Sequence, residues 1–441
     1  KIFSLTEYGY YKQFNLYCTY IGLFSIGVAD GIVLQFGDHN LEMLNKKKFR
    51  SYFSLFLLIQ AIFCLIIIAQ TVFSANVEYK FICITFALNI IAMNITGYFQ
   101  QISQITQRFN EYSLRNIIKS GLTVLSVILV YLIYKSTGQT SYKIFVALLT
   151  FSNYLLAFWY IWTYKTFIFG EKENGSSIIK EFKELIIIGF PLMCANLCST
   201  LILALDRQFV SVLFPTETYA VYAFAYNLLS LVTVAISACG IVLYPILKRT
   251  TKKTLTTTYS KLVAVVLILS FIASGIYFPL VEFIKWYLPN YKDSLLILRI
   301  IFPGLAATTA ITVVIHNYYK TLGESTLFFK KSLVILILSF AANVLAYYTV
   351  GEPYAISVAS IVVIGIWFAY VNVYMKRKYG CKSGRNYLLL ILLSAVFYTV
   401  SLIEVWWAGF MVYESTALIL IGLIFYKEVK DLNKFPDRYK K

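Results

Sequence analysis

The chain has 441 residues, of which 59% are hydrophobic and 14% charged, and its 39 Lys and Arg against 21 Asp and Glu give a net charge of +18. Soluble domains carry about 45–50% apolar and about 25% charged residues, so this composition excludes an ordinary soluble protein. The polar segments between the apolar runs are too short for a soluble catalytic or nucleotide-binding domain. In a membrane protein, an excess of basic residues marks the cytoplasmic loops, so we expect no nucleic-acid partner.

Thirteen apolar runs are long enough to form transmembrane helices, each of which needs about 20 residues to cross the hydrocarbon. The sequence therefore predicts an all-α polytopic membrane protein. The predicted spans are 8–36, 51–73, 81–104, 116–134, 144–164, 185–205, 219–247, 262–281, 294–316, 332–350, 354–375, 387–403 and 405–425.

The orientation of these spans follows from the positions of the basic residues. Thirty of the Lys and Arg residues lie in one set of alternate loops, including the C-terminal tail, and nine lie in the other set. Basic loops stay in the cytoplasm. The asymmetry predicts that Lys1 is external and that the C-terminus is cytoplasmic.

An internal repeat divides the chain into two halves. The segment LTEYGYYKQFNL at Leu5–Leu16 recurs as PTETYAVYAFAYNL at Pro215–Leu228, with an offset of 211 between the Thr-Glu pairs. Two further pairs of landmarks share an offset of 213, namely Asn110–Glu111 with Gly323–Glu324 and Gly138 with Gly351. A nearly constant offset is the signature of a duplicated structural unit.

The repeat predicts the domain organisation. We expect an N-terminal lobe at 1–164, a cytoplasmic linker at 165–184, a C-terminal lobe at 185–375, and two extra helices with a basic tail at 376–441. The second copy of the repeated segment follows a full span, whereas the first copy begins the chain at Lys1. We therefore expect that one helix, with about 30 residues, precedes Lys1 and completes two six-helix lobes.

Two segments carry a resemblance to a known family. GVADGIVLQFGD at Gly27–Asp38 and LALDRQFVSVLFPTETYAVYAFAYNL at Leu203–Leu228 resemble segments of the polysaccharide-biosynthesis exporters. These are the O-antigen and capsule repeat-unit flippases of the multidrug/oligosaccharidyl-lipid/polysaccharide exporter superfamily. The resemblance implies two six-helix lobes around a central cavity. It also implies translocation of an undecaprenyl-pyrophosphate-linked oligosaccharide across the bacterial cytoplasmic membrane by alternating access. Membrane lipids and a polysaccharide polymerase or chain-length protein are the implied partners.

Polar residues form a stripe at helical spacing in each half. The two stripes fall at equivalent positions of the repeat, which favours a water-filled cavity that both lobes line, although small polar residues also help helices to pack. The cavity-lining candidates are Asn15 and Thr19 in the first half and Tyr226, Ser230, Thr233 and Ser237 in the second.

Charged residues within or beside the spans are the other candidates, because a charge in a membrane is costly unless it is paired or hydrated. A pyrophosphate needs cations inside a transporter. We expect Lys12, Arg207 and Arg299 to contact the headgroup on the outward side, and Arg115 and Lys119 to admit it from the cytoplasm; the alternative is that these residues anchor helices at the interface. Asp30 and Asp206 are the candidates for coupling or gating. Asp206 is expected to pair with one of the cations, and Asp30 alternatively faces Lys46–Lys48.

The sequence contains no Ser/His/Asp set, no paired catalytic carboxylates and no metal-ligand cluster, so we expect neither enzymatic activity nor a cofactor. Two other functions stay open. One is a multidrug/cation antiporter of the same superfamily, which usually has twelve helices and membrane carboxylates in its N-terminal lobe. The other is a scaffold without transport activity. Fourteen inferred helices and the single carboxylate Asp30 in the first lobe favour the flippase.

Overall fold

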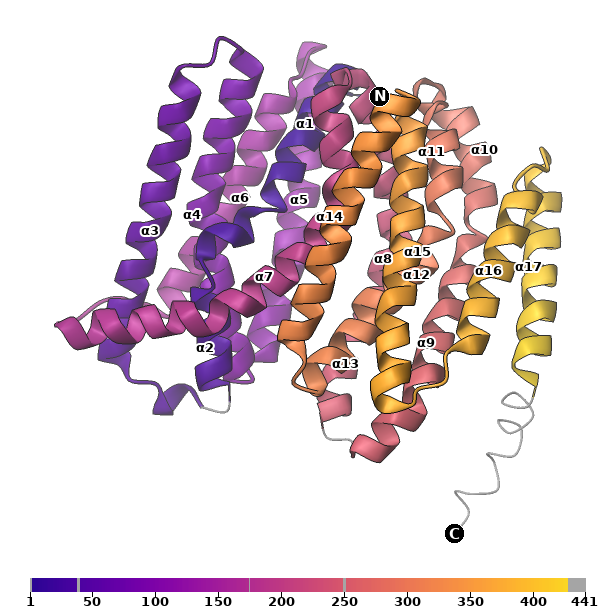
Figure 1. Cartoon of the computed structure of the whole chain (residues 1–441). Helices are drawn as coiled ribbons and strands as arrows, with labels where there is room; N and C mark the ends of the chain where they lie inside the picture. Colours follow the sequence, from indigo (N-terminus) through magenta and orange to yellow (C-terminus); the bar gives the residue numbers. More distant parts are fainter. Residues whose placement is uncertain (1, 38–39, 174, 249–250, 427–441) are drawn as a thin grey trace. The chain divides into compact units, whose positions relative to one another are not determined.

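The computed structural model describes residues 2–37, 40–173, 175–248 and 251–426, and within these residues it contains helices and no strand (Figure 1). The prediction of an all-α protein is therefore confirmed. The chain divides into two compact units. The first unit is Lys1–Ala204 with Pro215–Ala220, and the second is Leu205–Phe214 with Val221–Lys441.

The described residues form seventeen α-helices. The first seven are α1 (Leu5–Cys18), α2 (Val28–Phe36), α3 (Lys46–Val72), α4 (Val77–Ile105), α5 (Phe109–Thr137), α6 (Tyr142–Thr163) and α7 (Ser176–Leu213). The next six are α8 (Thr216–Lys248), α9 (Lys252–Ser274), α10 (Tyr277–Tyr287), α11 (Ser294–Ile301), α12 (Gly304–Thr309) and α13 (His316–Thr321). The last four are α14 (Ser325–Thr349), α15 (Pro353–Tyr379), α16 (Gly384–Val400) and α17 (Trp406–Ile424).

Each predicted span has a helical counterpart. In the described residues, nine helical segments are long and apolar enough to cross a membrane, and two bent pairs raise this number to eleven. Of the other two predicted spans, 219–247 corresponds to α8, which has 33 residues, and 387–403 corresponds to α16, which has 17. Helix α7 begins at Ser176, inside the segment expected as a linker, because Ile178, Phe182 and Leu185 form an apolar stripe that packs into the first unit.

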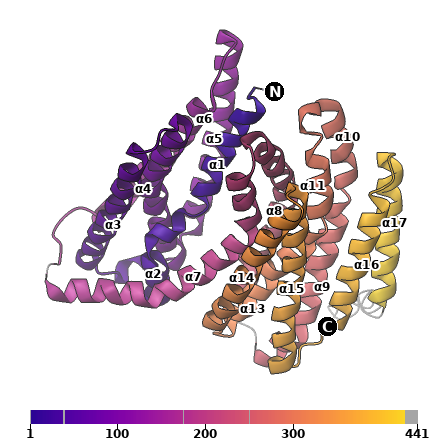
Figure 2. The ribbon, with the colours of Figure 1, turned by 45° about the horizontal axis from the view of Figure 1, so that its top comes forward.

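The first predicted span is broken, whereas the sequence predicted one continuous helix. Helix α1 begins with a capping box, in which Ser4 and Glu7 each accept from the other's backbone N–H. The segment Leu5–Ser25, which ends in a short 3₁₀ turn at Ile21–Ser25, then meets α2 at an angle of 55°. Two residues in the left-handed region end this turn, Ile26 with φ 49° and Gly27 with φ 79°. Figure 2 shows the change of direction between α1 and α2.

Two buried amide side chains donate to carbonyls of the 3₁₀ turn beside the break. Gln60 Nε2 on α3 donates to the carbonyl of Phe24 at 2.8 Å. Asn94 Nδ2 on α4 donates to the carbonyl of Ile21 at 3.3 Å and to Gln60 Oε1 at 2.6 Å. Irregular backbone at membrane depth requires such partners, because lipid supplies none. The break is therefore built into the scaffold of α3 and α4.

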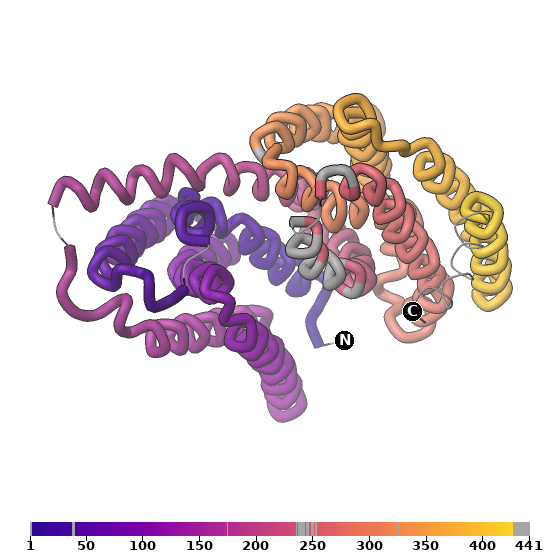
Figure 3. The backbone as a smooth tube through the Cα atoms, turned by 90° about the horizontal axis from the view of Figure 1, so that it is seen from below, coloured from indigo at the N-terminus to yellow at the C-terminus, as the bar shows by residue number. Residues whose placement is uncertain are grey.

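A glycine joint connects this broken span to α7. A Cβ on Gly27 would lie 2.6 Å from the backbone nitrogen of Phe190, and a Cβ on Gly31 would collide with the carbonyl of Leu185. Gly189 faces Gly27 and Gly31 in the same way, and Pro191 follows it inside α7. Figure 3 shows α7 as a long tube along the edge of the first unit. Small residues permit this close approach of the two backbones.

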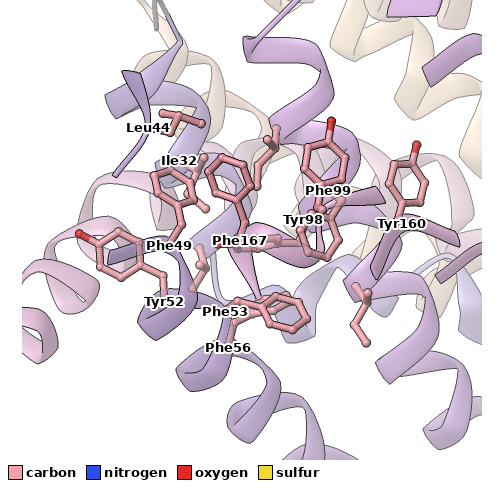
Figure 4. Packing of buried hydrophobic residues seen from close by; sticks show 14 of the residues in the cluster. Ile32, Leu44, Phe49, Tyr52, Phe53, Phe56, Tyr98, Phe99, Tyr160 and Phe167 are labelled. Atoms are coloured by element: carbon pink, nitrogen blue, oxygen red, sulfur yellow. The ribbon is translucent and has the colours of Figure 1, made fainter. Parts of the chain in front are cut away.

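Aromatic side chains fill the rest of the first unit between α3, α4 and α6 (Figure 4). Phe56 stacks on Tyr98 with 5.2 Å between the ring centroids, and Phe99 stacks on Tyr164 at 5.1 Å. Such pairs contribute about 0.5–1.5 kcal/mol each beyond the burial of their area. Packing of this kind holds helices together where lipid removes the hydrophobic driving force.

The turn glycines of the internal repeat have the same backbone conformation. Gly138 follows α5 with φ 70°, and Gly351 follows α14 with φ 73°. Both N–H groups bond back to carbonyls in the last turn of their helix. Only glycine adopts this conformation without strain, which explains why these two positions stood out as landmarks.

Candidate functional site

The polar stripe of the first unit lies on α1. Asn15 and Thr19 are exposed, whereas Phe14 and Leu16, on either side of Asn15, are buried. Lys12 stands on the same stripe, with its Nζ 4.7 Å from the ring centroid of Tyr11. The structure therefore places the three residues together, with the ammonium held over an aromatic face.

The repeated Thr-Glu segments pack against each other at one end of this stripe. Thr6 Oγ1 donates to Glu217 Oε1 at 2.5 Å, and Tyr219 OH donates to the carbonyl of Lys12 at 3.1 Å. A Cβ on Gly9 would lie 2.5 Å from the carbonyl oxygen of Thr216. The start of α8 is thus fastened to α1 within the first unit.

A buried carboxylate forms the centre of the polar cluster in the second unit. Asp206 is 2% exposed, and its Oδ2 accepts from Tyr222 OH at 2.8 Å and from Tyr226 OH. Its Oδ1 accepts from the N–H of Arg207 at 2.7 Å, and Ser357 Oγ donates to Tyr222 OH at 3.0 Å. The prediction that Asp206 pairs with a basic side chain is corrected: in the described residues its partners are two hydroxyls and an amide.

The two tyrosines reach Asp206 because α7 and α8 fold back on each other at Phe214 and Pro215. They were missed as partners, although Tyr226 was predicted to line the cavity. Arg207 lies beside the cluster, with its guanidinium carbon 4.9 Å from the Tyr226 ring centroid. The cluster therefore combines a buried carboxylate with an arginine that stacks on one of its donors.

The remaining stripe residues follow Tyr226 along α8. Ser230 is exposed and Thr233 is half-buried, and each hydroxyl donates to a carbonyl three residues earlier in the helix. These intrahelical bonds leave the hydroxyl oxygens able to accept. Ser237 lies outside the residues whose side chains the structure describes.

Arg115 and Lys119 occupy one face of α5. Arg115 is 3% exposed and stacks on Tyr160, with 4.0 Å between the guanidinium carbon and the ring centroid. Its Nη2 donates to Thr163 Oγ1 at 2.7 Å, and its Nη1 to Glu111 at 3.4 Å. These contacts fasten α5 to α6. Lys119, one turn further along, is half-buried.

Arg299 lies on α11 against the turn between α16 and α17. Its Nε donates to Ser401 Oγ at 2.8 Å and its Nη2 to the carbonyl of Tyr398 at 3.3 Å. It also lines a pocket of about 240 Å³ together with Lys285 and Glu404. Arg299 is thus associated with the extra C-terminal helices, and the structure does not bring it to the Asp206 cluster.

Asp30 lies in the first turn of α2, beside the glycine joint. A carboxylate is favoured there by the partial positive charge of a helix N-terminus. Asp30 was alternatively expected to face the basic run Lys46–Lys48, but two of these lysines pair with other carboxylates. Lys47 Nζ pairs with Glu171 at 2.7 Å, and Lys48 Nζ pairs with Glu181 at 2.8 Å.

Sequence analysis did not identify Gln60 and Asn94 as partners of the break. Both are polar residues within long apolar runs, which was the available signal. Other amides and hydroxyls in the first unit form interhelical bonds. Asn89 Nδ2 donates to Thr150 Oγ1 at 2.7 Å, and Asn153 Nδ2 donates to Asn89 Oδ1 at 2.8 Å. Polar residues in these spans therefore serve packing as well as the stripe.

Comparisons with solved structures identify the fold. The lipid II flippase MurJ in an inward closed conformation is similar with a TM-score of 0.70 and 14% identity, over 96% of this chain and 93% of that chain. An inward-facing multidrug resistance MATE family transporter of the MOP superfamily has a TM-score of 0.63 and 13% identity, over 85% of this chain and 94% of that one. A MOP superfamily transporter from Pyrococcus furiosus has a TM-score of 0.55 and 15% identity, over 84% of this chain and 88% of that one.

Sequence comparisons give the family. The sequence matches none of the curated proteins with which it was compared. A family model described as "Polysaccharide biosynthesis protein" matches residues 2–251, more than half of the chain. The fold is that of the MOP-superfamily transporters, and the resemblance seen in the sequence is confirmed. The chain belongs to the polysaccharide biosynthesis protein family.

Proposed function

We propose that this protein is a flippase that moves an undecaprenyl-pyrophosphate-linked oligosaccharide across the bacterial cytoplasmic membrane, for assembly of an O-antigen or capsule. One observation carries the proposal: a chain of the polysaccharide biosynthesis family shares its fold, over 96% of its length, with a flippase of the lipid-linked precursor lipid II. The described residues form helices, most of them long and apolar enough to cross a membrane, which suits translocation.

The second candidate, a multidrug/cation antiporter, has less support. The match to the MATE transporter covers 85% of this chain, compared with 96% for the lipid flippase. Helices α16 and α17 follow the two repeated halves, as two extra C-terminal helices. The first unit offers Asp30 as its one predicted membrane carboxylate. We therefore favour a lipid-linked substrate.

The headgroup contacts that we propose are Lys12 in the first unit and Arg207 in the second. A pyrophosphate cannot cross about 30 Å of hydrocarbon without cations to accompany it. Each of these residues lies beside its unit's polar stripe, and each side chain contacts a tyrosine ring. Lys119 on α5 is proposed to admit the headgroup from the cytoplasmic side. Arg115, buried against α6, positions α5.

Asp206 is the proposed coupling residue. Its carboxylate is buried and accepts from neutral donors, two tyrosine hydroxyls and one amide. Protonation would weaken both tyrosine bonds and loosen α7 from α8. Asp30 remains the gating candidate, at the joint of α2 and α7.

The proposed orientation follows the basic loops, with the C-terminus in the cytoplasm. Reporters fused after Lys48 or Arg377 are expected to be cytoplasmic, and reporters after Gly138 or Gly351 external. A reporter after Gly138 on the same side as one after Lys48 would contradict this topology. A polymerase or chain-length protein that receives the product is the proposed partner.

Transport in reconstituted vesicles tests the function. The protein is inserted into liposomes that contain a fluorescent undecaprenyl-pyrophosphate oligosaccharide, and the fraction of label that becomes accessible to a membrane-impermeant quencher is followed. Lys12→Gln and Arg207→Gln are each expected to lower the rate at least about ten-fold, since a charge-assisted phosphate contact is worth more than 1.4 kcal/mol. Lys135→Gln, an exposed lysine of the first unit, is the matched control.

The alternatives predict different results in the same vesicles. Export of a cationic drug without lipid movement would identify an antiporter. Unchanged lipid movement in both charge variants would remove their binding role. For coupling, Asp206→Asn is expected to abolish the response of transport to an imposed pH gradient, and Asp293→Asn, at an exposed position, is expected to keep it.

A further inference from the structure

A pocket in the second unit opens between α10, α11 and the turn that joins α16 to α17. Its volume is about 240 Å³, several times the roughly 30 Å³ that a water molecule occupies in the liquid. It therefore admits a chemical group of several heavy atoms. None of its lining residues belongs to the polar stripes or to the Asp206 cluster, and the proposed function makes no use of it.

Three charged side chains line this pocket without pairing to one another. Arg299 uses Nε and Nη2 for Ser401 and Tyr398, which leaves Nη1 without a hydrogen-bond partner among the described residues. Lys285 on α10 and Glu404 in the turn form no ion pair with any residue that the structure describes. The pocket thus presents two cations and one carboxylate that are available to a ligand.

The rim of the pocket is apolar and carries residue types that are typical of a membrane–water interface. Leu296, Leu402 and Ile403 line it and are exposed. Trp406 also lines it, and Trp286, on the same helix as Lys285, is 79% exposed. Tryptophans and exposed aliphatic side chains together mark the level of the lipid headgroups. Charges beside such a surface suit a molecule with a polar head and an acyl tail.

The combination of charges selects the headgroup. Arg299 and Lys285 suit a phosphate, the first as a hydrogen-bonding fork and the second as a point charge. Glu404 would repel a purely anionic headgroup, whereas it attracts an ammonium that can donate hydrogen bonds. An ethanolamine phosphate carries both groups, two carbons apart. We propose that this pocket binds the headgroup of one aminophospholipid, phosphatidylethanolamine, and so fixes α16 and α17 to α10 and α11 through a lipid.

Native mass spectrometry of the purified full-length protein tests the proposal. Phosphatidylethanolamine, phosphatidylcholine and phosphatidylglycerol with identical acyl chains are added in turn at equal concentrations. The unaltered protein is expected to retain phosphatidylethanolamine about ten-fold more than either of the others, the difference made by one charge-assisted hydrogen bond. Phosphatidylcholine lacks the N–H donor, and phosphatidylglycerol lacks the amine.

Variants separate the two halves of the headgroup. Glu404→Gln is expected to abolish the preference over phosphatidylglycerol, and Lys285→Gln to lower retention of all three lipids about ten-fold. Both residues are exposed, so these changes do not disturb the core. Glu282→Gln and Lys292→Gln are the matched controls, since both residues are exposed and neither lines the pocket. Arg299→Gln is expected to have the larger effect, because it also loses the bonds to the turn.

Three results would overturn the proposal. The first is an absence of headgroup preference in the unaltered protein. The second is a preference of the unaltered protein for phosphatidylglycerol over phosphatidylethanolamine, or a preference for phosphatidylethanolamine that persists in the Glu404→Gln variant. The third is a Lys285→Gln variant that retains lipid as the Lys292→Gln control does. Since no transport is measured, failure of the proposed flippase activity would leave this outcome unchanged.

Discussion

The buried amide on α3 makes the sharpest stability prediction, through the substitution Gln60→Leu. This change keeps the approximate volume and removes both polar atoms. It leaves the carbonyl of Phe24 without its 2.8 Å donor and deprives Asn94 of its 2.6 Å acceptor. Asn94 retains its bond to the carbonyl of Ile21. Because Gln60 is 0% exposed, water cannot replace what is lost.

The size of the effect follows from these two losses. A buried carbonyl without a partner costs about 1–3 kcal/mol, and an interhelical bond in a membrane contributes about 0.6 kcal/mol, with a maximum near 1.7. The free energy of unfolding should therefore fall by about 2–4 kcal/mol. The assay is reversible unfolding in mixed micelles by titration with sodium dodecyl sulfate, followed by far-UV circular dichroism.

The control for this prediction lies on the same helix. Gln70 is exposed on α3, and Gln70→Leu should change the free energy of unfolding by less than about 0.5 kcal/mol. If Gln60→Leu is as stable as Gln70→Leu, the broken span does not depend on this amide, and the explanation of the break given above is wrong.

Three further changes probe other contacts. Gly31→Ala should lower stability by about 1–3 kcal/mol by collision with α7, whereas Gly121→Ala, which meets nothing within 4 Å, should be neutral or stabilising in thermal unfolding. Burial raises the pKa of Glu324 but hydrogen bonds from a lysine and two tyrosines outweigh it, so the net pKa is lowered; its stabilisation is present above the ordinary value of about 4.3 and is lost as the pH falls through the lower folded value. Glu324→Gln should flatten this acid limb, and an unchanged limb would contradict the assignment. Arg115→Lys should lower the free energy of unfolding by about 1–3 kcal/mol, because it loses the stacking on Tyr160 and the bond to α6. A variant of normal stability that no longer transports would instead support a role of Arg115 in admitting the headgroup.

The sequence predicted which segments are helical, because an apolar run of about 20 residues has one stable arrangement in lipid. It did not predict that the span at 8–36 is broken. The break depends on Gln60 and Asn94, which lie 36 and 73 residues from the carbonyls they bond. Glycine at 27 and 31 was visible, but glycine alone is also common in unbroken membrane helices.

The site shows the same division between local pattern and distant contact. Helical spacing and the repeat sufficed to select Lys12, Asn15 and Thr19, and the structure places the first two on α1 and Thr19 at its C-cap. Asp206 was selected as a charge in a span, but its partners follow from the fold-back at Pro215, which brings residues 16 and 20 positions away to the carboxylate. Because we expected a basic partner for Asp206, the neutral hydroxyls of Tyr222 and Tyr226 were missed.

The two helix-ending glycines, Gly138 and Gly351, bear on the history of the chain. A duplicated gene begins with identical halves, and each half then accumulates substitutions independently. Positions that only glycine can occupy are retained for their backbone geometry, whatever surrounds them. Side chains are under no such constraint. Near the start of α5 the buried Arg115 pairs with Glu111, whereas before α14 Glu324 pairs with Lys378 of α15. The internal repeat is therefore easier to recognise from its turn glycines than from its side chains.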